Sequence, residues 1–423
     1  MIDHTDCYQL PAVRLLAHLG ADSETTPDGV AILLKEIDER ELTFPEVIGL
    51  IDALRSPSAD EIKAMVIDTS ARIRTRKHGR GVVPMAPVEV TNRCSSNCVF
   101  CGWRASNKDM QRLTISENLV MMQTNYLIEK GIYHIELVGG DHTAFVRDAL
   151  PNLLPEIRKA LPEEGMTYFC TMALTSNQYR NLRECGADSM IMWQETYDAD
   201  LYRRSIPAGP KACGIDDNFR VVRNGDGFRF RLESQDRAAR EGLAVSVGSM
   251  LGLNPNLGFE MLATIDHARY LSETYQLTQP VIVGMPTWNH ITTPQTDQRP
   301  EQTLSVENSF SYLAAIYFLS LHLHDVWVFP NCRVSIDAQV DAVHAAGAFT
   351  STEVKLGPGG YLPAALGQMS KADREVAFTE LAVLRNDKPE LDDMEQFQHH
   401  HHPHEEYVRA FARRDLFLQT VGR

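Results

Sequence analysis

The alternation of short β-rich segments with amphipathic helical segments from residue 87 onward constrains the fold most strongly. Apolar residues at helical spacing separate each β-rich segment from the next. Eight parallel strands joined by helices can close into a barrel, although a doubly wound open sheet would alternate in the same way. The number of strands favours an α/β fold of the (βα)8 TIM-barrel type. The predicted strands are residues 88–91, 135–138, 167–170, 190–193, 245–248, 281–284, 326–329 and 348–351.

The segments on either side of the predicted barrel have helical patterns. Before the barrel, Val47, Leu50, Ile51 and Leu54 recur at helical spacing. We expect residues 1–85 to form an N-terminal helical segment that caps one end of the barrel. Residues 86–355 would form the barrel, and residues 356–423 a C-terminal helical extension packed on it. A barrel of about 250 residues with two flanking segments accounts for a chain of 423 residues.

Net charge and apolar runs argue against two kinds of partner. The formal net charge is −15 and no long run of Lys or Arg occurs, so nucleic acid and anionic membrane surfaces are disfavoured. No apolar run reaches about 18 residues, the length of a spanning helix. The N-terminus has no secretory pattern. Five of the eight cysteines are scattered, which indicates a reducing cytoplasm rather than a disulfide scaffold.

The other three cysteines lie on one short segment that follows the first predicted strand. Cys94, Cys98 and Cys101 are separated by three and then two residues. A structural zinc site normally takes four ligands from two paired knuckles, and the chain has no second Cys-x-x-Cys pair. Three thiolates on one loop can instead bind three irons of a cubane cluster and leave the fourth iron open. We therefore predict an iron–sulfur cluster that can chelate a small molecule.

Polar residues directly follow several of the predicted strands. Asp141 ends a Gly-Gly-Asp segment after the second strand, Glu195 follows the fourth, and Arg333 follows the seventh. The active site of a barrel lies at the C-terminal ends of its strands. We expect these side chains to converge with the cysteine loop at one mouth of the barrel.

The cysteine segment resembles the signature of the radical S-adenosylmethionine superfamily, including the aromatic Phe100 before its third cysteine. Segments 101–107, 194–202, 231–237, 248–253 and 359–361 resemble its aromatic amino acid lyases. That group includes the 2-iminoacetate synthase of thiamine synthesis, the tyrosine lyase of hydrogenase maturation and the tryptophan lyase of thiopeptide synthesis. The resemblance implies a [4Fe–4S] cluster, S-adenosyl-L-methionine, a 5′-deoxyadenosyl radical, a small-molecule substrate and a one-electron reductant such as flavodoxin or ferredoxin.

The resemblance also implies which residues contact the cofactors. Asp141, where the family more often has Glu, would meet the methionyl amino group, and Glu195 would bind ribose hydroxyls. Arg237, and after it Arg231, would face the methionyl carboxylate, although either could form a surface ion pair instead. The full predicted set is Phe100, Gly139, Gly140, Asp141, Gln194, Glu195, Tyr197, Arg231, Arg237, Gly248 and Met250 for S-adenosylmethionine, and Cys94, Cys98 and Cys101 for the cluster.

The chain departs from the lyases in the segments that would hold the substrate. A Pro-Arg-Leu-Arg-Pro-like segment after the sixth strand is here Pro-Thr-Trp-Asn-His, so both arginines are absent. After the seventh strand an arginine survives as Arg333 without its acidic neighbour. We predict a substrate pocket formed by Trp288, Asn289, His290 and Arg333. Trp288 would stack on a ring or fill the barrel mouth, and Cys332 would be a reactive thiol or a small buried residue.

These observations predict radical fragmentation or rearrangement of a small amino-acid-like substrate, with C–C bond cleavage. No cysteine follows Cys332, which argues against a second C-terminal cluster and against release of carbon monoxide and cyanide. The alternatives are a mutase or sulfur-handling enzyme, similar to methylornithine synthase or biotin synthase, and a non-catalytic iron–sulfur or S-adenosylmethionine-binding homologue.

Two further motifs have more than one interpretation. The Gly-rich segment 357–360 could cradle a phosphate, but no Lys-Ser/Thr pair follows it, so an ordinary loop is favoured. The histidine-rich segment 399–404 is internal. It is interpreted as a surface segment or, alternatively, as a metal site.

Overall fold

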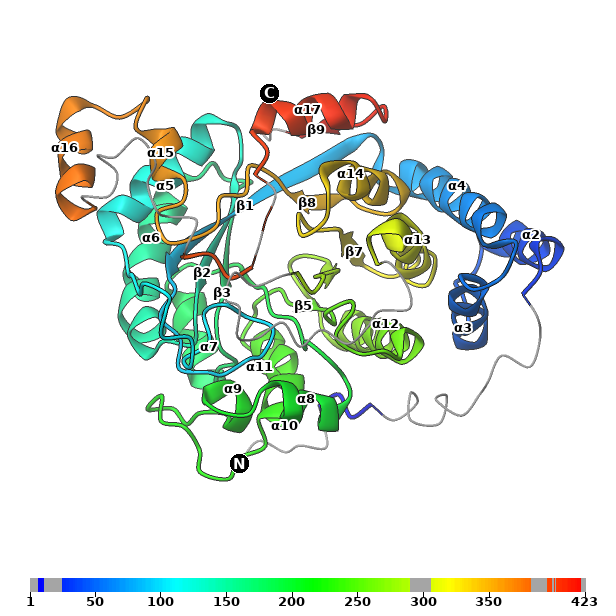
Figure 1. Ribbon diagram of the computed structural model, residues 1–423, viewed down its shortest axis with the longest axis horizontal. Coiled ribbons are helices and arrows are strands. Elements are labelled where there is room, and N and C mark those ends of the chain that lie inside the picture. Colours follow the sequence, from blue (N-terminus) through cyan, green and yellow to red (C-terminus); the bar gives the residue numbers. More distant parts are fainter. Residues whose placement is uncertain are drawn as a thin grey trace.

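The structure, a computed structural model, describes residues 7–10, 25–289, 306–381, 394–397, 399 and 401–419. Parallel strands run in chain order around a ring (Figure 1). Five strands pair in the order β4-β3-β2-β1-β8 and three in the order β5-β6-β7. Single parallel bridges, Ser189 to Ala244 and Val328 to Gly347, join the two sets on both sides. The predicted (βα)8 barrel is confirmed.

The strands lie where the apolar pattern predicts them, with differences in length. The second, third, sixth, seventh and eighth strands match within a residue or two, whereas the first is longer and the fourth and fifth are shorter. Their bounds are β1 Gly81–Thr91, β2 His134–Gly139, β3 Met166–Cys170, β4 Ser189–Met190, β5 Ser246–Val247, β6 Val281–Gly284, β7 Val326–Phe329 and β8 Phe349–Ser351.

Helices cover the outside of the barrel, and side-chain caps fix where several of them begin. Ser116 accepts a hydrogen bond from Leu119 N, and Ser335 accepts one from Ala338 N, so each helix starts at the next residue. The helices between strands are α5 Glu117–Glu129, η2 Phe145–Ala149, α6 Leu150–Ala160, α7 Ser176–Glu184, α8 Ala199–Ser205, α9 Pro210–Cys213, α10 Gly227–Leu232, α11 Ser234–Arg240, α12 Leu257–Thr274, η4 Glu307–Ser309, α13 Phe310–Leu319 and α14 Ile336–Ala345.

The N-terminal segment contributes α2 Pro27–Glu36, α3 Phe44–Ala53 and α4 Ala59–His78. Two of these helices lie against outer helices of the barrel, α3 on α12 and α4 on α13 and α14, and α2 packs on α4 (Figure 1). Arg74 of α4 is fully buried and donates to the carbonyls of Gly347, Gly79 and Gly81. It thereby ties α4 to the start of β1. Residues 1–6 and 11–24 of the predicted N-terminal helical segment lie outside the described residues.

The C-terminal segment contributes α15 Leu362–Ala365, α16 Lys371–Glu380 and α17 His404–Ala412. A short strand, β9 Phe417–Leu418, then pairs with the beginning of β1. In the described parts of the chain, no helix combines the length and apolarity needed to cross a bilayer.

Aromatic side chains fill the N-terminal half of the barrel. His134 shares a hydrogen bond of 2.8 Å with the Tyr168 hydroxyl, and Trp327 stacks on Phe349 with centroids 5.6 Å apart. Burial lowers the pKa of His134 to about 4, so the imidazole stays neutral in this layer. With this end filled, the accessible space lies at the C-terminal ends of the strands.

Candidate functional site

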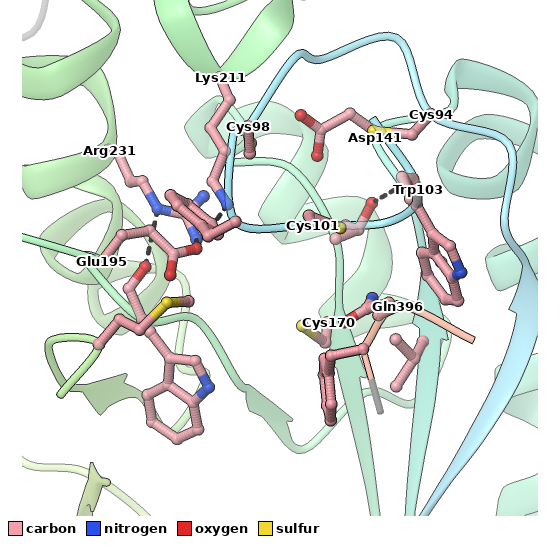
Figure 2. Close-up of a pocket in the computed structure, with 18 of the residues that line it drawn as sticks. Cys94, Cys98, Cys101, Trp103, Asp141, Cys170, Glu195, Lys211, Arg231 and Gln396 are labelled. Carbon is pink, nitrogen blue, oxygen red and sulfur yellow. Dashed lines mark hydrogen bonds and ion pairs between the residues drawn. The ribbon is translucent and has the colours of Figure 1, made fainter. Parts of the chain in front are cut away.

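A cavity opens at the C-terminal ends of the strands, and the cysteine loop forms one of its walls (Figure 2). The space between its atoms is about 750 Å³ including the open mouth, within the range of small-molecule sites. The lining residues come from many parts of the barrel: Cys94, Cys98, Phe100, Cys101, Trp103, Val138, Gly139, Gly140, Asp141, Cys170, Thr171, Trp193, Glu195, Lys211, Arg231, Met250, Arg333, Gln396 and Phe397.

Backbone hydrogen bonds hold the cysteine loop in place. Ser95 N donates to Asp141 O at 2.9 Å, and Asn97 N donates to Ala208 O at 3.0 Å. The Arg112 guanidinium donates to the carbonyls of Asn92, Trp103, Arg104 and Asn107. The loop is therefore organised by contacts that do not involve the thiols.

The three thiols of the loop share one environment. Burial raises the pKa of Cys94, Cys98 and Cys101, that of Cys94 to about 12, and the nearby Asp141 raises the pKa of Cys94 and Cys98 further. Thiolates this close to one another need a cationic centre to compensate their charge. Three converging thiols suit the irons of a cluster better than they suit separate reactive cysteines.

The Gly-Gly-Asp segment packs tightly against the cysteine loop. A Cβ on Gly140 would lie 2.5 Å from Arg93 O and 2.8 Å from Cys94 Cβ. Asp141 is buried, and its carboxylate accepts a hydrogen bond from the Ser96 hydroxyl. Close approach of the backbone is therefore what requires glycine at residue 140.

Substituting alanine at Gly140 is expected to push the cysteine loop away from β2. The clash involves backbone atoms and should lower the free energy of unfolding by about 1–3 kcal/mol, with loss of bound iron after reconstitution. Urea denaturation and iron analysis would measure both effects. Gly367→Ala is the matched control, because nothing lies within 4 Å of the added Cβ. Equal stability and iron content in the two variants would contradict this account of Gly140.

Glu195 is at the centre of a buried ion network on the opposite wall. Its carboxylate accepts from Lys211 Nζ at 2.5 Å and lies 3.4 Å from Arg231 Nη2. Burial raises the pKa of Glu195, but Lys211 and then Arg231 outweigh burial and the pKa is lowered overall. The carboxylate is therefore charged at neutral pH and aligns both cations along the cavity.

Arg231 has an unused donor in this network. Its Nε donates to Trp193 O at 2.8 Å, whereas the buried Nη1 has no hydrogen-bond partner among the described residues. A buried guanidinium nitrogen without a partner is costly, and a bound carboxylate would satisfy it. This donor of Arg231 fits the carboxylate of S-adenosylmethionine. The adjacent carboxylates of Glu195 and Asp141 fit its hydroxyl groups and its amino group, respectively.

Lys211 was not identified from the sequence. It lies on α9, far in sequence from any strand, and reaches the cavity because this turn packs on the cysteine loop. Lys211 N donates to Ser96 Oγ at 3.0 Å, and Gly209, with φ of +98°, would clash with Ser95 O if it carried a Cβ. The Gly-Pro pair before Lys211 is a turn signal, but it does not show what the turn contacts. Cys170, Trp193, Gln396 and Phe397 were also missed.

Several residues predicted to contact S-adenosylmethionine lie outside the cavity lining. Arg237 donates to Leu174 O and stacks on the Phe230 ring at 4.2 Å. Tyr197 bonds His267 through its hydroxyl. Gln194 is fully buried, and Gly248 packs against Gly284 O. The predicted residues that do line the cavity are Cys94, Cys98, Phe100, Cys101, Gly139, Gly140, Asp141, Glu195, Arg231, Met250 and Arg333.

The predicted substrate residues are only partly brought together. Arg333 lines the cavity and lies over the Phe397 ring, 4.0 Å from its centroid. Asn289 Nδ2 donates to Arg333 O at 2.9 Å and thus supports this segment from behind. Trp288 is buried but does not line the cavity. His290 lies outside the described residues.

A short C-terminal strap, Met394–Phe397, closes one side of the cavity. Gly102 N donates to Gln396 O at 2.7 Å, and the Trp103 indole donates to Met394 O at 2.8 Å. His401 of the histidine-rich segment pairs with Glu395 at 2.8 Å, which raises the pKa of His401. Among the described residues, no group of three or more His, Cys, Asp or Glu side chains is arranged to hold a single metal ion. This includes the three loop cysteines, each of which would bind a different iron of a cluster. The described part of the histidine segment thus has a structural contact with the strap.

The chain resembles known proteins in both sequence and fold. The 2-iminoacetate synthase of Escherichia coli is 26% identical over 314 residues, covering 73% of this chain and 76% of that protein. The 3-methylornithine synthase of Methanosarcina barkeri is 25% identical over 195 residues, covering 45% and 50%. The FeFe-hydrogenase maturase HydG from Carboxydothermus hydrogenoformans superposes with a TM-score of 0.70 over 92% of this chain and 79% of that chain, at 19% identity. No family model matches the chain.

The relatives indicate which class of protein the chain resembles. Sequence similarity to 2-iminoacetate synthase and the shared barrel confirm the predicted resemblance to the radical S-adenosylmethionine superfamily. The chain is an enzyme, and it resembles the enzymes of this superfamily. The homologues imply an iron–sulfur cluster and S-adenosylmethionine as cofactors.

Proposed function

We propose that the enzyme cleaves S-adenosylmethionine reductively and uses the resulting radical to fragment a small amino-acid-like substrate at a C–C bond. The observation that carries the proposal is the placement of Cys94, Cys98 and Cys101 across one cavity from Glu195 and Arg231. When bound, the cluster supplies the electron that breaks a carbon–sulfur bond of S-adenosylmethionine and yields the 5′-deoxyadenosyl radical.

The protein's own residues would hold the cofactors in a fixed geometry. The three cysteines would bind three irons and leave the fourth for the amino and carboxylate groups of S-adenosylmethionine. Asp141 would accept a hydrogen bond from the methionyl amino group, the free Nη1 of Arg231 would donate to the carboxylate, and Glu195 would accept from ribose hydroxyls. We favour Arg231 over Arg237 for the carboxylate because Arg231 lines the cavity and has a donor without a partner.

The remaining wall of the cavity supports an amino-acid-like substrate. Arg333 offers a cation for a carboxylate, and the rings of Trp193 and Phe397 offer flat apolar surface beside it. Enclosure by the barrel and the strap would keep water away from a radical intermediate. A mutase that rearranges a carbon skeleton is the second candidate, because 3-methylornithine synthase is among the relatives. The electron would come from a small carrier such as flavodoxin or ferredoxin in a reducing cytoplasm.

A substrate screen tests the proposal. Reconstituted enzyme would be incubated with S-adenosylmethionine, dithionite and one candidate substrate at a time. The candidates are tyrosine, tryptophan, glycine and lysine, and the 5′-deoxyadenosine formed with each would be quantified. The substrate should raise its rate of formation, and Arg333→Met should raise KM for that compound while leaving the unstimulated rate intact, since the carboxylate partner alone is lost. The assignment of Arg333 as the partner of a substrate carboxylate would be contradicted if no compound with a carboxylate stimulated the enzyme. An unchanged KM in Arg333→Met would contradict it as well.

A further inference from the structure

Cys170 is a fourth thiol on the wall of the cavity, separate from the three cysteines of the loop. It is the last residue of β3 and lines the cavity together with Thr171 and Val138. It packs at the edge of a cluster formed by Trp103, Met110 and Val138, which Cys94 and Cys101 also border. Figure 2 shows it below Cys101, between Gln396 and the side of the cavity that carries Glu195.

A buried carboxyl group lies next to this thiol. On β2, His134 points into the barrel interior and Val138 lines the cavity, so Glu136 between them points inward as well. The Cys170 thiol lies close enough to the Glu136 carboxyl for each group to shift the pKa of the other. Burial raises the pKa of Glu136 to about 8, against the opposing effects of Arg333 and then of Cys170. Glu136 therefore holds a proton beside the thiol at neutral pH.

The space that Cys170 faces has the features of a ligand site rather than of a filled core. Arg231 on the same cavity is 4% exposed, and its Nη1 has no partner in the described part of the chain. Cys332 provides a contrast, because it is buried near Val354, Leu356 and Phe397 and does not line the cavity. Of these two thiols only Cys170 is placed to touch a bound molecule.

We propose that Cys170 donates a hydrogen atom to the carbon-centred radical formed in the cavity. The inference rests on the proposed function. The S–H bond breaks homolytically and a C–H bond forms, so the carbon radical is quenched and a thiyl radical remains on Cys170. The thiyl radical is reduced by one electron from the one-electron reductant of the proposed reaction and takes one proton from Glu136, which regains its proton from solvent.

The inference can be tested without knowing the substrate. In its absence the thiol would quench the 5′-deoxyadenosyl radical itself, and in D2O the thiol carries deuterium. Reconstituted enzyme, freed of dithiothreitol by gel filtration, would be incubated in D2O with S-adenosylmethionine and dithionite. Mass spectrometry should show 5′-deoxyadenosine heavier by one mass unit. The label should be lost in Cys170→Ala and Cys170→Ser and kept in the control Cys332→Ala, with equal iron content and visible spectra in all four proteins.

The outcomes separate this inference from the proposed function. Unlabelled 5′-deoxyadenosine from the wild type, or label retained in Cys170→Ser, would overturn the role of Cys170 and leave the proposed function standing. An intact cluster that yields no 5′-deoxyadenosine would overturn both. Loss of the cluster in Cys170→Ser would make Cys170 a ligand and also contradict the inference.

Glu136 would act through Cys170 as a positioning residue and proton source, and its variants have their own readout. Glu136→Gln should keep the label in a first burst of 5′-deoxyadenosine and then slow, because the thiyl radical is reprotonated poorly. Glu136→Asp should restore the steady rate. A uniform loss of rate in both variants, with no burst, would indicate a purely structural role and contradict this assignment.

Discussion

Reconstituted Cys98→Ala is expected to hold far less iron than the wild type and to form 5′-deoxyadenosine only at the background rate of the assay. The wild type should bind about four irons and four sulfides per chain. Cys98 is buried and lines the cavity with the other two cysteines of the loop. The substitution would remove one of the three proposed ligands and leave an apolar methyl group in its place. Iron and sulfide analysis with visible spectroscopy would measure the change.

The matched control is Cys185→Ala. Cys185 is the residue after α7, partly exposed and outside the cavity. This variant should keep the wild-type iron content, spectrum and rate. A full cluster in Cys98→Ala, or equal loss in Cys185→Ala, would refute the assignment of the loop cysteines as ligands.

Glu195→Gln is expected to have the second largest effect. The substitution keeps the shape of the side chain but removes the anion between Lys211 and Arg231, which are both largely buried. Removing one partner of a buried ion network typically costs about 3–5 kcal/mol, because the remaining charges lose their compensation. We expect a fall of this order in the free energy of unfolding by urea denaturation. Binding of S-adenosylmethionine, measured by calorimetry on the reconstituted protein, should weaken as well.

The pH dependence gives an independent check on Glu195. Because the folded pKa of Glu195 is lowered from its ordinary 4.5, its stabilisation is fully present above that value and is lost as pH falls through the folded pKa. The acid-side loss of stability below 4.5 should therefore be smaller in Glu195→Gln than in the wild type. Asp148→Asn removes an ion pair with Arg147 that is more than half exposed, so its effect on the free energy of unfolding should be much smaller than that of Glu195→Gln. Equal effects of the two substitutions would contradict the buried network.

The barrel and the cysteine loop could be predicted because both depend on local sequence. Apolar spacing switches from a period of about two to about 3.6 residues at each strand–helix junction. The three cysteines of the cluster motif lie within one short segment. The strand ends then indicated Asp141, Glu195 and Arg333, which all line the cavity.

The rest of the site depends on contacts that local sequence does not encode. Arg231 and Arg237 lie on consecutive short helices, and which of them reaches the cavity depends on how these helices rotate against the barrel. Lys211 enters through a turn packed on the cysteine loop, and Phe397 enters from a segment far along the chain. The sequence predicts Cys170 only as the last residue of a strand and does not indicate that it lines the cavity. Such placements arise from tertiary packing, which overrides local pattern.

The formation of 5′-deoxyadenosine by the anaerobically reconstituted protein tests the central claim most directly. Protein with a complete cluster, given S-adenosylmethionine and dithionite without substrate, should produce 5′-deoxyadenosine and methionine in equal amounts, as measured by liquid chromatography and mass spectrometry. Heat-treated protein and Cys98→Ala should produce neither. A complete cluster together with bound S-adenosylmethionine and no 5′-deoxyadenosine would contradict the proposed chemistry.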